Sequence, residues 1–140
     1  ALLEAKVDVH IRTTTGWEAI HFAAQRGNVD MCHLLVEAAA NVNSRTSEGN
    51  TPLHNAAQRN RFATVKYLIA AKGNVLEMDN DGHDALWFAE LSGQTPTAGY
   101  LIELVAAAKY TLAQRGGKNS LLKYADIDGG VGVQQLGPQQ

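Results

Sequence analysis

A period of 33 residues constrains this chain more than any other feature of its sequence. Gly16, Gly49 and Gly82 recur at this interval, and the residues after each glycine align in one register across three copies. The second halves repeat as well, because Leu34-Leu35-Val36 matches Tyr67-Leu68-Ile69 in the next copy. Self-similarity at such a period is typical of arrays in which each repeat packs only on its neighbours. The sequence therefore predicts a stack of repeated units.

Each copy is predicted to form two helices. In the second copy the Thr51 hydroxyl can cap the first helix, and Pro52 then occupies the first helical position, where its missing N–H costs nothing. Leu53, Ala56 and Ala57 fall on one face at helical spacing. Because alanine is small, a partner helix can approach this face closely. A helical hairpin is therefore expected in every copy.

The ends of the predicted helices carry their own signals. Gly27 and Gly93 stand where a left-handed residue ends a first helix, and Asn60 occupies the same place in the second copy. Asparagine tolerates that conformation better than most residues. The second helices show apolar residues at three- and four-residue steps, which predicts one buried stripe on each. In the third copy this helix is predicted to run from Thr95-Pro96 to about Ala108.

The residues Gly49, Thr51-Pro52-Leu53-His54 and Ala56-Ala57 resemble the ankyrin repeat signature, a turn followed by two helices. The resemblance covers residues 1–108, and a period held across three copies is far more specific than one short motif. It implies an all-α ankyrin repeat solenoid of stacked helix-turn-helix units. Polar tips such as Asn80-Asp81-Gly82 carry turn chemistry, and we expect them to project as β-hairpin fingers.

The period also divides the chain into segments. Residues 117–125 can be laid over 49–57 if two residues are inserted, so the last segment is interpreted as a degenerate capping repeat with a tail. Because the chain opens on Ala1 and not on Met, we expect it to be part of a longer protein. The predicted segments are 1–12, the end of a truncated preceding repeat; 13–45, 46–78 and 79–114, three ankyrin repeats; and 115–140, the degenerate repeat and tail.

Histidine and cysteine are interpreted as structural residues. His21 and His54 share one repeat position, where the resemblance implies that the imidazole hydrogen-bonds its own turn and the next repeat. Trp87 replaces this histidine in the third copy, so an apolar contact is expected there. Cys32 falls on the core stripe of its helix, and the adjacent His33 points in a different direction, so the two cannot act as nucleophile and base.

Composition argues against several classes of function. The 140 residues carry 12 Lys and Arg against 14 Asp and Glu, a formal net charge of −2, so nucleic acid is not an expected partner. The single cysteine and the lack of a signal segment or long apolar span favour a cytoplasmic protein, with the nucleus as an alternative, and no membrane insertion. The sequence Asp126-Ile127-Asp128-Gly129 is unlike a calcium loop, because Gly137 stands where a glutamate ligand is required. We expect no metal, no cofactor, no catalytic residue and no enzymatic activity.

The predicted site is the concave face that stacked repeats form from their fingers and the exposed sides of their first helices. The family resemblance implies contact positions just before each turn glycine, just after it, and at the end of each first helix. These positions are Arg12, Thr14, Thr15, Trp17, Gln25, Arg26, Arg45, Ser47, Glu48, Asn50, Gln58, Arg59, Met78, Asn80, Asp81, His83, Leu91 and Ser92.

The favoured function is a scaffold or adaptor module that binds another protein. Trp17, Arg26 and Arg59 are expected to form the energetic centre, because tryptophan and arginine are enriched among interface hot spots. An acidic or extended peptide segment is the favoured partner, bound by a monomer. Trp17 could instead fold back on its own hairpin and the arginines pair with neighbouring acids. A targeting or regulatory domain of a larger enzyme, with its catalytic domain outside this sequence, and a plain structural spacer are the alternatives for function.

Overall fold

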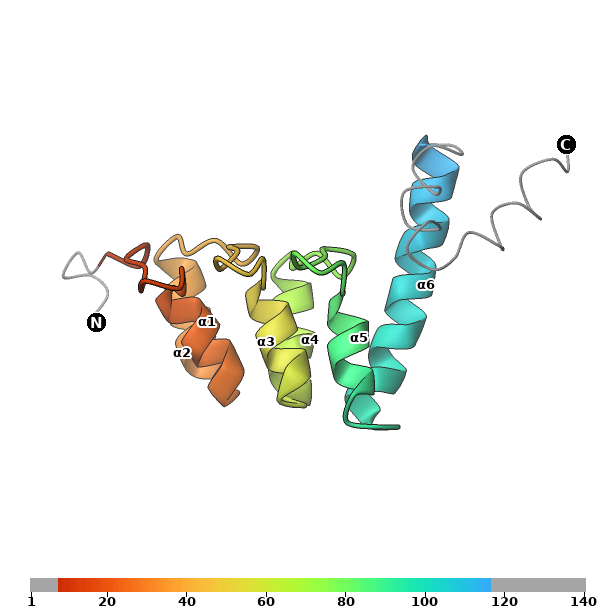
Figure 1. Cartoon of the computed structure of the whole chain (residues 1–140), viewed down its shortest axis with the longest axis horizontal. Coiled ribbons are helices and arrows are strands. Elements are labelled where there is room, and N and C mark those ends of the chain that lie inside the picture. The colour runs from red at the N-terminus through yellow and green to blue at the C-terminus, as the bar shows by residue number, and fades with distance from the viewer. Residues whose placement is uncertain (1–7, 117–140) are drawn as a thin grey trace, which may run out of the picture. The chain divides into compact units, whose positions relative to one another are not determined.

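The computed structural model describes residues 8–116, and every regular element in that range is an α-helix (Figure 1). The chain consists of two compact units, Ala1–Ile102 and Glu103–Gln140. In the second unit, residues 103–116 are described, and all of them are helical. Residues 1–7 of the predicted preceding repeat and residues 117–140 of the predicted capping repeat and tail lie outside the described residues.

The helices of the first unit follow one another in pairs, one pair for each copy of the 33-residue period. They are α1 (Ala19–Arg26), α2 (Val29–Glu37), α3 (Pro52–Gln58), α4 (Phe62–Ala70), α5 (Ala85–Glu90) and the beginning of α6 (Pro96–Gly116). The first helices form a row, because α3 contacts both α1 and α5, and α2 contacts α4 behind them. The predicted stack of helix-turn-helix units is therefore confirmed for α1 with α2 and for α3 with α4, with α5 continuing the row.

Helices α3 and α5 begin at residues whose side chains cap them. Thr51 caps α3, with its hydroxyl accepting the N–H of His54 at 3.4 Å, and Pro52 takes the first helical position as predicted. The Asp84 carboxylate accepts the N–H of Trp87 at 2.9 Å at the start of α5. Such caps satisfy N–H groups that have no partner inside the helix.

The predicted left-handed residues are also confirmed. Gly27 has φ 76°, Asn60 has φ 59° and Gly93 has φ 92°. Each follows a first helix and reverses the chain toward the second helix of its pair. One repeat position therefore accepts either glycine or asparagine, because both reach this conformation at low cost.

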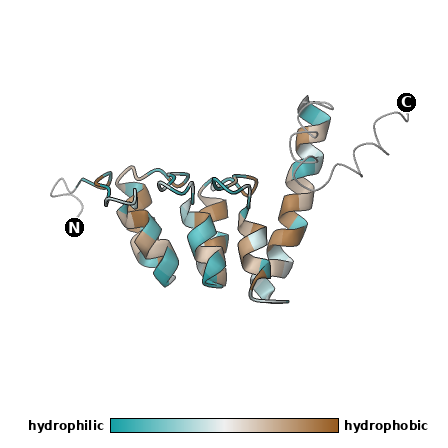
Figure 2. Ribbon diagram, in the orientation of Figure 1, coloured by the Kyte–Doolittle hydropathy of each residue, from teal (hydrophilic) through white to brown (hydrophobic). Residues whose placement is uncertain are grey.

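The core lies between the two rows of helices and between successive pairs. Large apolar side chains such as Ile20, Leu53 and Leu68 are fully buried. Ala24 and Ala57, at one repeat position on α1 and α3, are also fully buried, so neighbouring helices can approach closely there. Figure 2 shows hydrophilic residues along the turns, with hydrophilic and hydrophobic patches alternating along the helices.

The predicted β-hairpin fingers are not confirmed, because residues 8–116 contain no strand. Each repeat instead begins with a tight turn. In the first repeat the N–H of Thr13 donates to the carbonyl of Trp17, and in the second the N–H of Thr46 donates to the carbonyl of Asn50, both at 2.9 Å. Glu18 directly follows the first turn and is already the residue that caps α1. No residues remain there to extend a ladder of strand hydrogen bonds.

Candidate functional site

The turns of successive repeats are joined at their tips. The N–H of Ser47 donates to the carbonyl of Thr15, and the N–H of Asn80 donates to the carbonyl of Glu48, both at 3.0 Å. The side-chain amide of Asn80 also donates to the Ser47 carbonyl at 2.8 Å. The predicted contact residues at these tips are all exposed: Thr14, Thr15, Ser47, Glu48, Asn80 and Asp81.

Two predicted contact residues, Arg12 and Arg45, are engaged within the stack. Arg12 donates to the carbonyl of Arg45 at 2.8 Å and pairs with the carboxylate of Glu18 at 3.2 Å. Arg45 repeats the carbonyl contact one period later, donating to Met78 at 2.7 Å, and pairs with Glu77, which stands at the repeat position of Ser44. Both guanidinium groups therefore bind one turn to the next. The recurrence of arginine at one repeat position, Arg12 and Arg45, was the feature of the sequence that could have indicated this structural role.

His21 bridges the first and second repeats as the family resemblance implied. Its Nδ1 accepts the N–H of Glu18 at 3.0 Å, so the proton lies on Nε2. Nε2 donates to the carbonyl of Ser44 at 2.9 Å and to that of Asn50, in the second repeat, at 3.2 Å. Burial lowers the pKa of His21, because a charged ring loses its hydration there. The ring is therefore a neutral structural group.

The third repeat lacks this bridge. Trp87 stands at the histidine position and is 39% exposed. Its ring stacks on His83 with centroids 3.6 Å apart and meets Phe88 edge-on. The expected apolar contact is thus only partly found, because one of the two rings is the polar imidazole of His83 and both contacts join Trp87 to its own turn and helix. An aromatic surface thus lies at the start of α5.

Trp17 packs on its own repeat. Its ring lies 4.8 Å from that of Phe22 and 5.8 Å from that of His21, measured between centroids. Trp17 is half-buried, whereas Phe22 is 42% exposed. The tryptophan thus folds back, but onto side chains of α1 and not onto its hairpin, and the rings of Trp17 and Phe22 form an aromatic pair at the start of α1.

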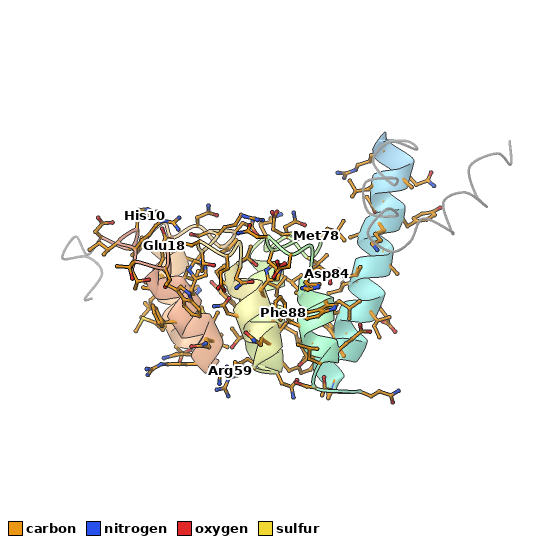
Figure 3. The ribbon with its side chains drawn as sticks, viewed as in Figure 1. His10, Glu18, Arg59, Met78, Asp84 and Phe88 are labelled. Atoms are coloured by element: carbon orange, nitrogen blue, oxygen red, sulfur yellow. The ribbon has the colours of Figure 1, made fainter. Side chains whose placement is uncertain are left out.

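Arg26 and Arg59 occupy equivalent ends of α1 and α3, and both are exposed (Figure 3 labels Arg59). Neither side chain makes a hydrogen bond or ion pair with another residue of the described range. The alternative in which they pair with nearby acids is thus not observed. Gln58, Leu91 and Ser92, which share these helix-end positions, are exposed as well.

The remaining predicted contact residues are half-buried. They are Gln25, Asn50, Met78 and His83. The carbonyl of Gln25 accepts a hydrogen bond from Arg61 Nε at 3.0 Å, so its main chain is engaged with the next repeat.

One repeat position on the first helices was missed by sequence reasoning. It carries Phe22 on α1, Asn55 on α3 and Phe88 on α5. The aromatic residues were visible in the alignment of the copies, but only the packed structure shows that Asn55 is buried between neighbouring helices.

A group of possible metal ligands lies in the third turn. Atoms of Asp79, Asp81 and His83 that could bind an ion lie within 4.8 Å of one another. One carboxylate oxygen of Asp79, however, accepts the N–H groups of Asp81 at 3.0 Å and His83 at 2.9 Å. The arrangement is therefore explained by closure of the turn.

Helix pairs stacked at a 33-residue period, with turns and buried histidines joining successive pairs, define a helical repeat protein. The family model described as ankyrin repeats (3 copies) matches residues 1–77 and 40–114. The chain belongs to the ankyrin repeat family. A search of curated proteins finds no match. Among the described helices, none has the length and apolar character needed to span a membrane.

Proposed function

We propose that this chain binds another protein on the face formed by α1, α3, α5 and the turns, which is the concave face expected of a repeat array. Ankyrin repeats are generally protein–protein interaction modules and are typically non-catalytic. The observation that carries the proposal is the pair Arg26 and Arg59, which are exposed, equivalent in the repeat and without an acidic partner in the described range. We expect a scaffold or adaptor role and no catalysis.

The partner supported best is an extended, acidic peptide segment. An arginine fork binds a carboxylate through paired hydrogen bonds, and two forks one repeat apart favour acidic residues at matching intervals along the segment. The exposed turn tips would widen the contact beside these arginines. Arg12 and Arg45 contribute by holding the turns in position, since their own donors are engaged.

Selection of random 12-residue peptides displayed on phage, with the immobilised chain as bait, tests this proposal. We expect peptides rich in Asp and Glu to be enriched, and to be lost when the bait carries Arg26→Glu and Arg59→Glu. Lys66→Glu is the matched control, because it reverses one exposed charge on α4, in the other row of helices. No enrichment, or enriched peptides that bind the double variant equally well, would refute the proposal.

A further inference from the structure

The amide of Asn55 stands out on the proposed binding face. Asn55 is only 3% exposed, yet its side chain makes no hydrogen bond with any described residue. Neither amide atom is among the fully enclosed atoms without a partner, so both ends of the amide keep some access to the surface. Buried polar side chains are hydrogen-bonded as a rule, and leaving one unpaired costs about 1–3 kcal/mol.

Helix formation gives no reason for an asparagine at this place. Asn55 lies inside α3, between the capping residue Thr51 and the end of the helix at Gln58. Asparagine is a poorer helix former than alanine, which would also leave no polar group unpaired. Neither helix formation nor a hydrogen bond with a described residue accounts for this amide, and both of its ends reach the surface, where a ligand can bind them.

The neighbours of Asn55 in the row of first helices are aromatic. Phe22 on α1 and Phe88 on α5 occupy the same repeat position, and α3 contacts both helices. The ring of Trp17 lies beside that of Phe22, and the ring of Trp87 lies 5.1 Å from that of Phe88, measured between centroids. One unpaired amide thus lies between two aromatic pairs.

We propose that Asn55 binds the main chain of the partner segment, donating to one carbonyl and accepting from one N–H. An asparagine amide offers a donor and an acceptor side by side, which is the arrangement that a peptide backbone complements. The flanking aromatic pairs then receive apolar side chains of the segment, and Arg26 and Arg59 bind its acidic residues.

The spacing of the repeats sets the length of the segment. Packed helices lie about 8–10 Å apart, and an extended chain advances about 3.3 Å for each residue. About three residues therefore span one repeat, and about six or seven run from the aromatic pair on α1 to that on α5. The inferred ligand is an extended peptide of this length, acidic and with an apolar residue on each side of the anchored peptide group.

This inference rests on the proposed function, and the test keeps the two apart. The probe is the acidic peptide enriched on the wild-type chain, titrated by calorimetry. Asn55→Ala and Asn55→Asp should each weaken its binding at least tenfold, since Asp keeps the shape but loses the donor and adds a charge. Asn55→Ala should keep the fold, with the circular dichroism spectrum unchanged, because the replaced amide has no partner in the folded chain.

Backbone N-methylation of the peptide, one position at a time, identifies the bond itself. At one position, N-methylation should weaken binding of the peptide to the wild-type chain at least tenfold. The same methyl group should have little effect on binding to Asn55→Ala, because this variant has already lost the hydrogen bond. If binding of the peptide requires Arg26 and Arg59 but neither Asn55 variant weakens this binding, the role of Asn55 is refuted while the proposed function stands. The absence of any N-methyl position coupled to Asn55 would also overturn the inference.

Discussion

The Nε2 atom of His54 donates a hydrogen bond to the main-chain carbonyl of His83 in the next repeat, 3.0 Å away. The Nδ1 atom of the same ring accepts the N–H of Thr51 at 3.1 Å. One buried, neutral imidazole thus joins the start of α3 to the turn before α5. Stability of the stack should depend on this ring.

His54→Ala should lower the free energy of unfolding by about 1–3 kcal/mol, because it leaves buried backbone groups without a partner. Urea denaturation measures the change. His33→Ala is the control, since His33 is exposed and its contacts with Glu37 and Tyr67 lie on the surface, where such contacts are worth little. A loss below about 0.5 kcal/mol for His54→Ala, the range of ordinary surface substitutions, would contradict the bridging role.

Acid should destabilise the stack through the two bridging histidines. Burial lowers the pKa of both His21 and His54 below the ordinary value of 6.5, so the unfolded chain takes up protons that the folded chain does not. The free energy of unfolding should therefore be constant above about pH 7 and fall as the pH drops below 6.5. Urea denaturation of the wild type and of His54→Ala at pH 7.5 and 5.5 isolates the contribution of one ring. An equal pH dependence in both proteins would count against this account.

A side chain at the turn glycine should cost more stability in the second repeat, at Gly49, than in the third, at Gly82. Gly49 and Gly82 share a turn position and have φ 85° and 83°, so alanine is strained at both by about 1–2 kcal/mol. A Cβ atom at Gly49 would lie 2.8 Å from the backbone nitrogen of Asn80, whereas one at Gly82 meets open space. Gly49→Ala should therefore destabilise the chain clearly more than Gly82→Ala in urea denaturation. Equal losses would show that the turns are not closely stacked.

Much of the fold could be predicted from the sequence, because it depends on local chemistry repeated in register. The period located the helix pairs, Thr51 and Pro52 marked the start of a helix, and Asn60 marked a left-handed residue. The β-hairpin prediction failed for a local reason too, since Glu18 begins the capping of α1 directly after the turn.

Side-chain roles on the surface were harder to predict, because they depend on how one repeat sits on the next. Arg12 and Arg45 were predicted to contact a partner, but the stacking of the turns engages both internally. Trp17 was expected at the energetic centre of the partner site, yet its ring packs against Phe22 on the same repeat and is half-buried. The burial of Asn55 depends on the helices on either side of it, which no single repeat reveals.

Trp17 should contribute to binding through the aromatic surface that it forms with Phe22. Trp17→Ala should weaken binding of the selected acidic peptide by about 1 kcal/mol or more, because the pair of rings offers a preformed apolar contact. Tyr110→Ala is the control, since Tyr110 is an exposed aromatic residue of the second unit. Calorimetric titration compares the two variants. Equal affinities for Trp17→Ala and the wild type, with helical circular dichroism unchanged, would move the site away from α1.

The most direct test of the binding account is a calorimetric titration of the selected acidic peptide into the wild-type chain and into the Arg26→Glu, Arg59→Glu double variant. Both side chains are exposed and unpaired in the described range, so the fold should survive the change. We predict at least a tenfold rise in Kd for the double variant, equivalent to about 1.4 kcal/mol or more. An unchanged Kd, with the circular dichroism spectrum intact, would contradict the claim that α1 and α3 carry the partner site.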